Sequence, residues 1–262
     1  MRVLVTRPQR EAQKLVDALR ALGFDAFALP LIDVSGPPDL AAVARAWQQI
    51  AEFDAVMFVS GNAVEQFFAL KPPSNTCFTA QSPNAVRAFV TGPGSQSALS
   101  KAGVRAQWVD APDAQAEQFD SEALWQVVHK QIVPGFRLLI VRGSVGDDTP
   151  SGAGRDWFAA QVQAAGGQVD YVVAYQRDLP QWTPELFTLA AQAAEEGAVW
   201  LFSSSQAISN LTILCPALSW ERAHAVVTHC RIGQTAREAG FGTVVESRPS
   251  TPALVASIES LQ

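Results

Sequence analysis

Three segments in the first half of the chain recur in the second half, in the same order and at nearly constant spacing. An apolar run ending in Arg, a segment that starts with Phe, and a segment that runs from Thr to Gly each occur twice: 2–7 with 137–142, 58–64 with 202–208, and 91–103 with 228–240. A repeat of this kind predicts one structural unit present twice. The chain of 262 residues is long enough for two such units, each with its own hydrophobic core.

Each copy is predicted to alternate short strands with helices. Apolar runs predict buried strands at 2–6, 54–59, 86–91, 137–142, 198–203 and 224–228. Stretches that end mostly at a Gly predict helices at 9–22, 62–70, 95–102, 155–165, 206–214 and 231–239. This alternation predicts an α/β protein with two similar parallel-sheet domains, in which helices cover both faces of each sheet.

Small, polar or basic residues follow every predicted strand, in the loops 6–8, 60–62, 91–95, 142–144, 203–205 and 228–231. Ligands of parallel α/β sheets bind at the carboxyl ends of the strands, where helix N-termini attract anions. An N-cap role accounts for any single Ser, Thr or Asn in these loops. Capping does not require Arg7, Arg142 and Arg231 at strand ends, so the loops together predict an anion-binding site.

Composition excludes several classes of protein. A net charge of −6 disfavours a nucleic-acid partner, whose phosphates would need a basic surface. No apolar stretch approaches about 18 residues, and the apolar window at the N-terminus is too short for a signal peptide, so we expect a cytoplasmic protein with no membrane contact. Cys77, Cys215 and Cys230 are widely spaced without a CxxC pair, which disfavours disulfides and zinc.

Common cofactor and hydrolase motifs are absent. The Thr-Gly-Pro-Gly-Ser segment at 91–95 lacks the third Gly and the later acidic residue of a dinucleotide fingerprint, and there is neither a P-loop nor a GxSxG elbow. His224, His229 and Cys230 have no carboxylate nearby and are interpreted as structural, not as metal ligands. Asp147 and Asp148 are interpreted as a solvated turn. No cofactor is therefore expected.

Seven short motifs, taken in order, resemble those of the uroporphyrinogen-III synthase family. They are Val-Leu-Val-Thr-Arg-Pro at 3–8, Phe-Val-Ser-Gly-Asn-Ala-Val at 58–64, Thr-Gly-Pro-Gly-Ser at 91–95, Val-Arg-Gly at 141–143 with Gly-Arg at 154–155, Ala-Tyr-Gln-Arg at 174–177, Leu-Phe-Ser-Ser-Ser at 201–205, and His-Cys-Arg-Ile at 229–232. The likeness extends from residue 1 to about 258. It departs from the family at Val59, where Thr is usual, and at 229–232, where a threonine contact is lost.

The resemblance implies a cofactor-free lyase that converts linear hydroxymethylbilane to uroporphyrinogen III, with loss of water and inversion of ring D. It also implies one discontinuous domain, 1–34 with 178–262, a second domain over 38–170, and two connecting strands at 31–35 and 172–177. The expected ligand is a polycarboxylate linear tetrapyrrole, and the expected state is a monomer. Because this ligand is too large for the crevice of one sheet, strand ends of both domains are expected to contribute.

The resemblance assigns Tyr175 as a general acid for the departing hydroxyl, with a non-participating strand tyrosine as the alternative. It also assigns Ser60, Ser95 and Ser204 to substrate binding. The strand-end argument adds Arg7 and Arg142, and Arg231 is expected to replace the lost threonine contact. The remaining expected binding residues are Asn62, Gly94, Ser203 and Thr228.

Two other functions remain compatible with the residues alone. A non-catalytic protein that binds a small anion would have the same strand-end loops without needing Tyr175. A nucleotide-dependent transferase would also use a parallel α/β sheet, and it would bind a nucleotide measurably.

Overall fold

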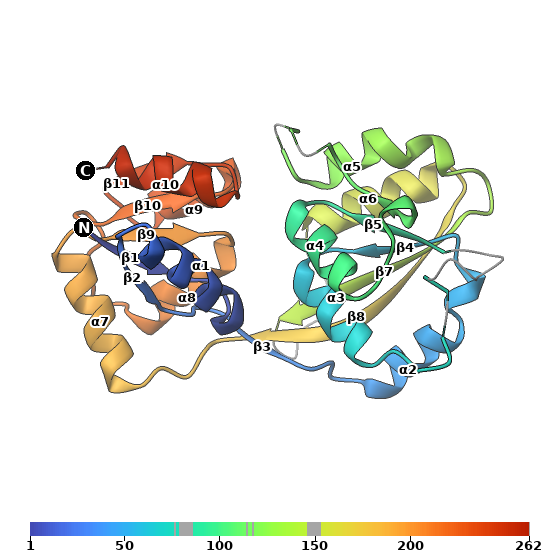
Figure 1. Ribbon diagram of the computed structural model, residues 1–262, viewed down its shortest axis with the longest axis horizontal. Helices are drawn as coiled ribbons and strands as arrows, with labels where there is room; N and C mark the ends of the chain where they lie inside the picture. Colours follow the sequence, from blue (N-terminus) through green and yellow to red (C-terminus); the bar gives the residue numbers. More distant parts are fainter. Residues whose placement is uncertain (76, 79–85, 114, 117, 146–152, 262) are drawn as a thin grey trace. The chain divides into compact units, whose positions relative to one another are not determined.

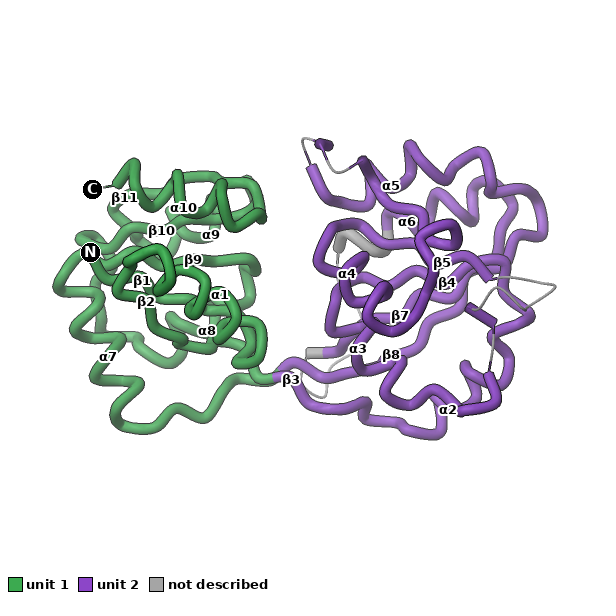
Figure 2. Tube along the Cα trace, in the orientation of Figure 1, with its two compact units in different colours: residues 1–33, 178–262 green, residues 34–177 purple. Residues whose placement is uncertain are grey.

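The structure is a computed structural model that describes residues 1–75, 77–78, 86–113, 115–116, 118–145 and 153–261, with side chains at 145 and 153–156 left undescribed. The turn predicted at Asp147 and Asp148 lies outside the described residues. The chain divides into two compact units (Figure 2): unit 1 comprises Met1–Asp33 and Asp178–Gln262, and unit 2 comprises Val34–Arg177. The chain therefore passes between the units twice, after Asp33 and after Arg177.

Unit 1 contains a parallel sheet in the order β11-β10-β9-β1-β2 (Figure 1). Its strands are β1 (Arg2–Val5), β2 (Asp25–Ala28), β9 (Val199–Phe202), β10 (His224–Val227) and β11 (Thr243–Glu246). Its helices are α1 (Gln9–Ala21), α7 (Pro184–Glu195), α8 (Ser205–Leu214), α9 (Cys230–Glu238) and α10 (Thr251–Glu259).

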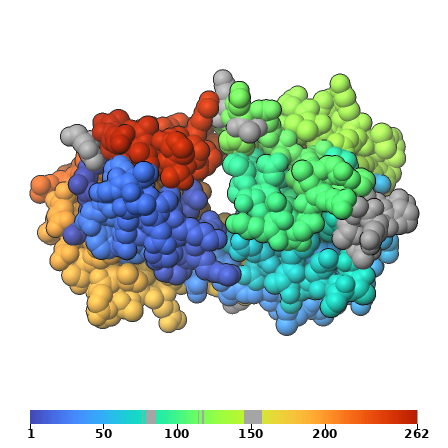
Figure 3. Space-filling view, in the orientation of Figure 1, coloured from blue at the N-terminus to red at the C-terminus, as the bar shows by residue number. Residues whose placement is uncertain are grey.

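Helices cover both faces of this sheet. On one face, α1 and α10 pack Leu19 and Ile258 against Val3 and Val199, and the two helices lie side by side on the surface, dark blue and red in Figure 3. On the other face, α8 and α9 pack against β9 and β10. β9, the central strand, is short and wholly buried, as expected for a parallel strand covered on both sides.

Unit 2 contains a second sheet in the order β3-β8-β7-β4-β5-β6, in which β8, β7, β4, β5 and β6 pair in parallel. Its strands are β3 (Asp33–Ser35), β4 (Ala55–Phe58), β5 (Arg87–Val90), β6 (Val109–Asp110), β7 (Arg137–Val145) and β8 (Gln168–Asp178). Its helices are α2 (Leu40–Gln48), α3 (Gly61–Ala69), α4 (Pro93–Lys101), α5 (Ser121–Val128) and α6 (Ala153–Ala164), with 3-10 turns η1 (Ile50–Glu52), η2 (Ala106–Trp108) and η3 (His129–Gln131).

The two faces of the second sheet have separate cores. On one face, α2, α3 and α4 bury Trp47, Phe67 and Leu99 against Val56 and Phe58 of β4. The Trp47 indole N–H donates to the Phe67 carbonyl at 3.0 Å, which satisfies its one polar atom inside this core. On the opposite face, α5 and α6 form the other core. The face on which a β8 side chain lies therefore decides which helices it meets.

The predicted fold class is confirmed: this is an α/β protein with two parallel-rich sheets covered by helices. Among the described residues, no helix combines the length and the apolar character needed to cross a membrane.

Candidate functional site

In unit 1, predicted binding residues follow three neighbouring strands. The strand order β10-β9-β1 places Thr228, Ser203 and Arg7 along the carboxyl edge of the sheet. The Thr6 hydroxyl donates to the Leu201 carbonyl at 2.7 Å, which ties the end of β1 to β9. Parallel strands end at the same edge of a sheet, so the structure brings these three predicted residues together.

The charged and hydroxyl groups at this edge are accessible. Ser203 and Arg231 are exposed, and Arg7 and Thr228 are half-buried. Within the described part of the chain, neither guanidinium is paired with a carboxylate. Ser204 is the N-cap residue of α8, yet its side chain makes no capping hydrogen bond. These groups are therefore available to an anionic ligand.

His229 occupies the N-cap position of α9. Its Nδ1 accepts a hydrogen bond from the Arg231 backbone N–H at 3.1 Å, so the imidazole performs the role that Ser, Thr, Asn or Asp usually fills. The described residues contain no group of three or more His, Cys, Asp or Glu side chains that could hold a metal ion. His229, predicted from the sequence to be structural, is therefore a helix cap, a role that the sequence pattern did not indicate.

In unit 2, two helix N-termini lie next to each other at the carboxyl ends of β4 and β5. Ser60 caps α3, and its Oγ accepts from the Ala63 N–H at 3.1 Å. Gly92 is the N-cap residue of α4. A Cβ at Gly61 would lie 3.6 Å from the Gly94 carbonyl oxygen, which shows how closely the first turns of α3 and α4 approach. Such paired N-termini present backbone N–H groups to an anion.

Three other predicted binding residues lie in these first turns. Ser95 lies inside α4 and is 6% exposed, because α4 begins at Pro93, two residues before the predicted start. Asn62 is half-buried, and Gly94 is exposed. Gly94 is thus the most accessible of the three, and Ser95 is the least.

The predicted loop at 142–144 is wrong, because the structure continues β7 to Val145. Arg142 pairs with Val173, whereas Gly143 pairs with Tyr175, so that Ala174 of β8 has no partner on β7. This register shift is a β-bulge, in which the extra, unpaired residue redirects the side chain that follows it. Arg142 is therefore a strand residue.

The Arg142 side chain is also less accessible than predicted. It is 5% exposed, and its guanidinium carbon lies 4.1 Å from the centroid of the Tyr171 ring. This cation–π contact orients the guanidinium from within the sheet. As a substrate ligand, Arg142 would have to act from a buried position, unlike Arg7 and Arg231.

The bulge decides where Tyr175 points. Residues 171, 173 and 175 would share one face of a regular strand. Because Ala174 is the extra residue, Tyr175 instead joins Val172 in the core on the α3 side of the sheet. The Tyr175 side chain is 2% exposed, and its hydroxyl lies 3.0 Å from Ser60 Oγ at the N-terminus of α3.

Gly143 provides the space for the Tyr175 ring. A Cβ at Gly143 would lie 2.5 Å from Cζ and 2.6 Å from Cε2 of Tyr175, which is well inside normal contact. Gly143 was not among the predicted site residues, although the Val-Arg-Gly motif contains it. The repeat is the one feature of the sequence that distinguishes this position: the first copy has Pro8 where the second has Gly143.

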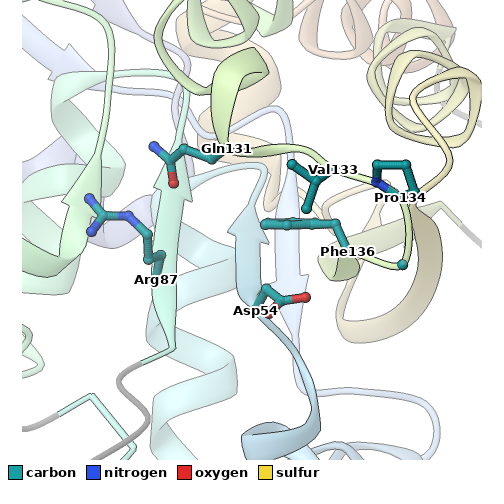
Figure 4. Close-up of a pocket in the computed structure, with 7 residues that line it drawn as sticks. Asp54, Arg87, Gln131, Val133, Pro134 and Phe136 are labelled. Atoms are coloured by element: carbon teal, nitrogen blue, oxygen red, sulfur yellow. The ribbon is translucent and has the colours of Figure 1, made fainter.

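A cavity of about 530 Å³ lies at the opposite, amino-terminal edge of the unit 2 sheet, lined by Asp54, Arg87, Gln131, Val133, Pro134, Gly135 and Phe136 (Figure 4). Its polar groups already have partners. Arg87 Nη2 donates to Asp110 Oδ1 at 2.7 Å, and this pairing raises the pKa of Arg87. Asp54 accepts from the Arg137 backbone N–H at 2.7 Å. We therefore place the candidate site at the carboxyl edge.

Comparisons with known proteins identify one matching family. The profile of the family described as "Uroporphyrinogen-III synthase HemD" matches residues 13–256. The chain is 28% identical to the uroporphyrinogen-III synthase of Salmonella typhimurium over 255 residues, and 29% identical to that of Escherichia coli over 248 residues. Each alignment covers 92% of this chain and 92% of the relative.

Solved structures share the fold. A uroporphyrinogen III synthase mutant from Thermus thermophilus matches with a TM-score of 0.57 at 16% identity, covering 100% of this chain and 99% of that one. The enzyme from Helicobacter pylori matches with a TM-score of 0.57 at 15% identity, covering 100% of both chains. The profile spans both units and nearly the whole chain, and the chain therefore belongs to the uroporphyrinogen-III synthase family, hydro-lyases of tetrapyrrole biosynthesis.

Proposed function

We propose that Tyr175 is the general acid of the reaction of this family, in which hydroxymethylbilane is cyclised to uroporphyrinogen III. The observation that carries this assignment is the hydroxyl of Tyr175, delivered by a bulge to the carboxyl edge of the sheet beside the N-terminus of α3. A Tyr that served only to fill the core would not need its ring redirected by a bulge and seated on a glycine.

The chemistry needs a proton donor and a fixed geometry. Loss of the ring-A hydroxyl as water leaves an electrophilic azafulvene, which the substituted carbon of ring D attacks before ring D inverts. A neutral phenol beside the departing oxygen supplies the proton, an effect of about 10²- to 10⁴-fold in typical general-acid catalysis. Positioning of rings A and D supplies the rest, since closure without inversion is the competing reaction.

We further propose that the strand-end residues bind the carboxylates of the substrate. In unit 1 these are Arg7, Ser203, Ser204, Thr228 and Arg231, and in unit 2 they are Asn62, Gly94, Ser95 and Arg142. Arg7 and Arg231 are accessible and have no carboxylate partner within the described residues. Bidentate guanidinium pairing suits a carboxylate better than an ammonium does.

Long-range electrostatics work against this binding, because the chain carries a net charge of −6 and the substrate is a polyanion. Attraction must therefore arise locally, within about one Debye length, or roughly 8 Å at physiological salt. Helix N-termini act over that range. We expect a monomer that works in the cytoplasm and binds this substrate but neither nucleic acid nor membrane, and sedimentation of the purified protein tests whether it is a monomer.

The decisive experiment supplies hydroxymethylbilane, generated enzymatically, to the purified protein and separates the product isomers. Formation of uroporphyrinogen III faster than spontaneous closure supports the function. Formation of uroporphyrinogen I alone would reject it and would favour a non-catalytic anion-binding protein.

Tyr175→Phe tests the role of the residue. The ring and its packing remain, so turnover should fall by at least about tenfold while the fold is retained. Near-normal turnover would show that a water molecule or a substrate carboxylate supplies the proton.

A further inference from the structure

We infer that Ser60 is a positioning residue for Tyr175: its hydroxyl donates to the phenol oxygen, so that the Tyr175 proton is directed toward the substrate. This inference rests on the proposed role of Tyr175 and concerns how that hydroxyl is oriented. The resemblance to the family placed Ser60 among the substrate-binding residues, whereas the structure gives its side chain two protein partners.

The hydrogen-bond inventory of Ser60 supports this direction. A serine hydroxyl has one proton and two acceptor sites. One acceptor site is used by the Ala63 N–H at 3.1 Å, and the phenol oxygen of Tyr175 lies 3.0 Å away. If Tyr175 donated to Ser60, its proton would be held by the protein and unavailable to a leaving group. If Ser60 donates, the Tyr175 proton is free for the substrate.

The N-terminus of α3 strengthens the donor. A hydroxyl that accepts one hydrogen bond becomes a better donor in the next, since hydrogen bonds in a chain polarise one another. The positive end of the α3 dipole lies at the same point and favours negative charge on the phenol oxygen as its proton leaves. The chain Ala63 N–H to Ser60 hydroxyl to Tyr175 hydroxyl therefore connects the helix terminus to the acid.

The Tyr175 ring cannot easily adopt another orientation. It is 2% exposed, with Gly143 against the face of the ring near Cζ. The ring is held by packing, and Ser60 is the described residue whose side chain bonds its hydroxyl. Loss of the Ser60 hydroxyl should therefore change the direction of the Tyr175 proton without moving the ring.

The test separates positioning from helix capping. Ser60→Gly removes the hydroxyl, but glycine is nearly as good an N-cap as serine, so α3 should lose little stability. Ser60→Thr retains both the hydroxyl and the cap. We expect Ser60→Gly to lower kcat by about tenfold with KM changed less than threefold. Ser60→Thr should keep most of the wild-type kcat. Asp120→Ala, which removes the cap of α5, is the matched control and should lower stability but not kcat.

A double-mutant cycle tests the link to Tyr175. In the Tyr175→Phe background, Ser60→Gly should lower kcat less than twofold further, because the hydroxyl that it orients is gone. Multiplicative losses would overturn the inference and return Ser60 to a direct substrate contact. An unchanged kcat in Ser60→Gly alone would also overturn it.

A spectroscopic measurement checks the contact without any turnover. The chain has two tyrosines, so ¹³Cζ-labelled tyrosine gives two NMR signals, and Tyr171→Phe assigns them. Ser60→Gly should shift the Tyr175 signal and leave that of Tyr171 unchanged, and an unshifted Tyr175 signal would refute the contact. If the wild-type protein forms no uroporphyrinogen III but Ser60→Gly still shifts the Tyr175 signal, the proposed function is wrong. The hydrogen bond between Ser60 and Tyr175 would still be supported.

Discussion

Gly143→Ala should destabilise unit 2 because it forces a methyl group into the Tyr175 ring. The added Cβ would lie 2.5, 2.6 and 2.9 Å from three ring atoms, about 1 Å inside the separation of roughly 3.5–4.0 Å at which carbon atoms attract. The ring is the far end of a side chain, but at 2% exposure it is enclosed by the core formed by α2, α3 and α4. It can escape only by displacing its neighbours.

Two opposing effects set the size of the change. Overpacking a core costs about 1–3 kcal/mol, whereas replacing a glycine inside a strand with alanine gains roughly 0.5–1 kcal/mol of backbone entropy. The strain is larger, so the net loss should be about 0.5–2 kcal/mol. Displacement of the ring also breaks the 3.0 Å contact with Ser60, so turnover should fall to the level of Tyr175→Phe.

Urea unfolding followed by circular dichroism measures the free energy of unfolding. Gly36→Ala is the matched control, since a Cβ there meets no atom within 4 Å. In a Tyr175→Leu background the obstructing ring atoms are absent, so Gly143→Ala should become neutral or stabilising. The same loss of stability in both backgrounds would show that Gly143 is not required to make room for the Tyr175 ring.

Other consequences of the structure can be checked separately. Ser204→Ala should raise KM a few-fold and leave kcat nearly unchanged in steady-state assays, because it removes about 1 kcal/mol of hydrogen bonding from a polyanion held by many groups; an equal loss in kcat would contradict a purely binding role. Burial raises the pKa of the Cys215 thiol, whereas Cys230 is exposed, so mass spectrometry after brief iodoacetamide treatment should find Cys230 alkylated first, and early modification of Cys215 would contradict its burial. The Ala42 N–H lowers the pKa of Asp39 below its ordinary 3.8, so the stabilisation from this cap is present above about pH 4 and is lost as the pH falls through the lowered pKa. Asp39→Asn should therefore flatten the acid limb of thermal stability, and an unchanged limb would show that other carboxylates govern it.

Much of the fold follows from the sequence because parallel strands buried on both faces are continuous apolar runs. The Ala-Val-Met-Phe run of β4 and the Val-Trp-Leu-Phe run of β9 were predicted to within a residue or two. The edge strands β2 and β11 were not predicted. They are only partly buried, and their sequences lack the unbroken apolar run by which the buried strands were recognised.

The chemistry of the candidate site is also visible in the sequence. Hydroxyl and guanidinium groups after the strands predicted an anion-binding edge, because the carboxyl ends of parallel strands meet there. Ser60 as an N-cap was an open alternative, and the structure shows that its Oγ caps α3 and also contacts Tyr175. Capping is a local property, which the sequence can indicate. The contact between Ser60 and Tyr175 is not local, so the sequence does not indicate it.

Only the tertiary structure determines how Tyr175 is oriented. Ser60 and Tyr175 are 115 residues apart, and the face on which Tyr175 lies depends on the unpaired Ala174. A bulge is a property of the pairing between two strands, and β8 considered alone would place Tyr175 on the face of Tyr171. The need for glycine at position 143 is apparent only when the Tyr175 ring is seen to pack against it. The sequence thus determined which groups are available, and the register of β7 against β8 decided which of them meet.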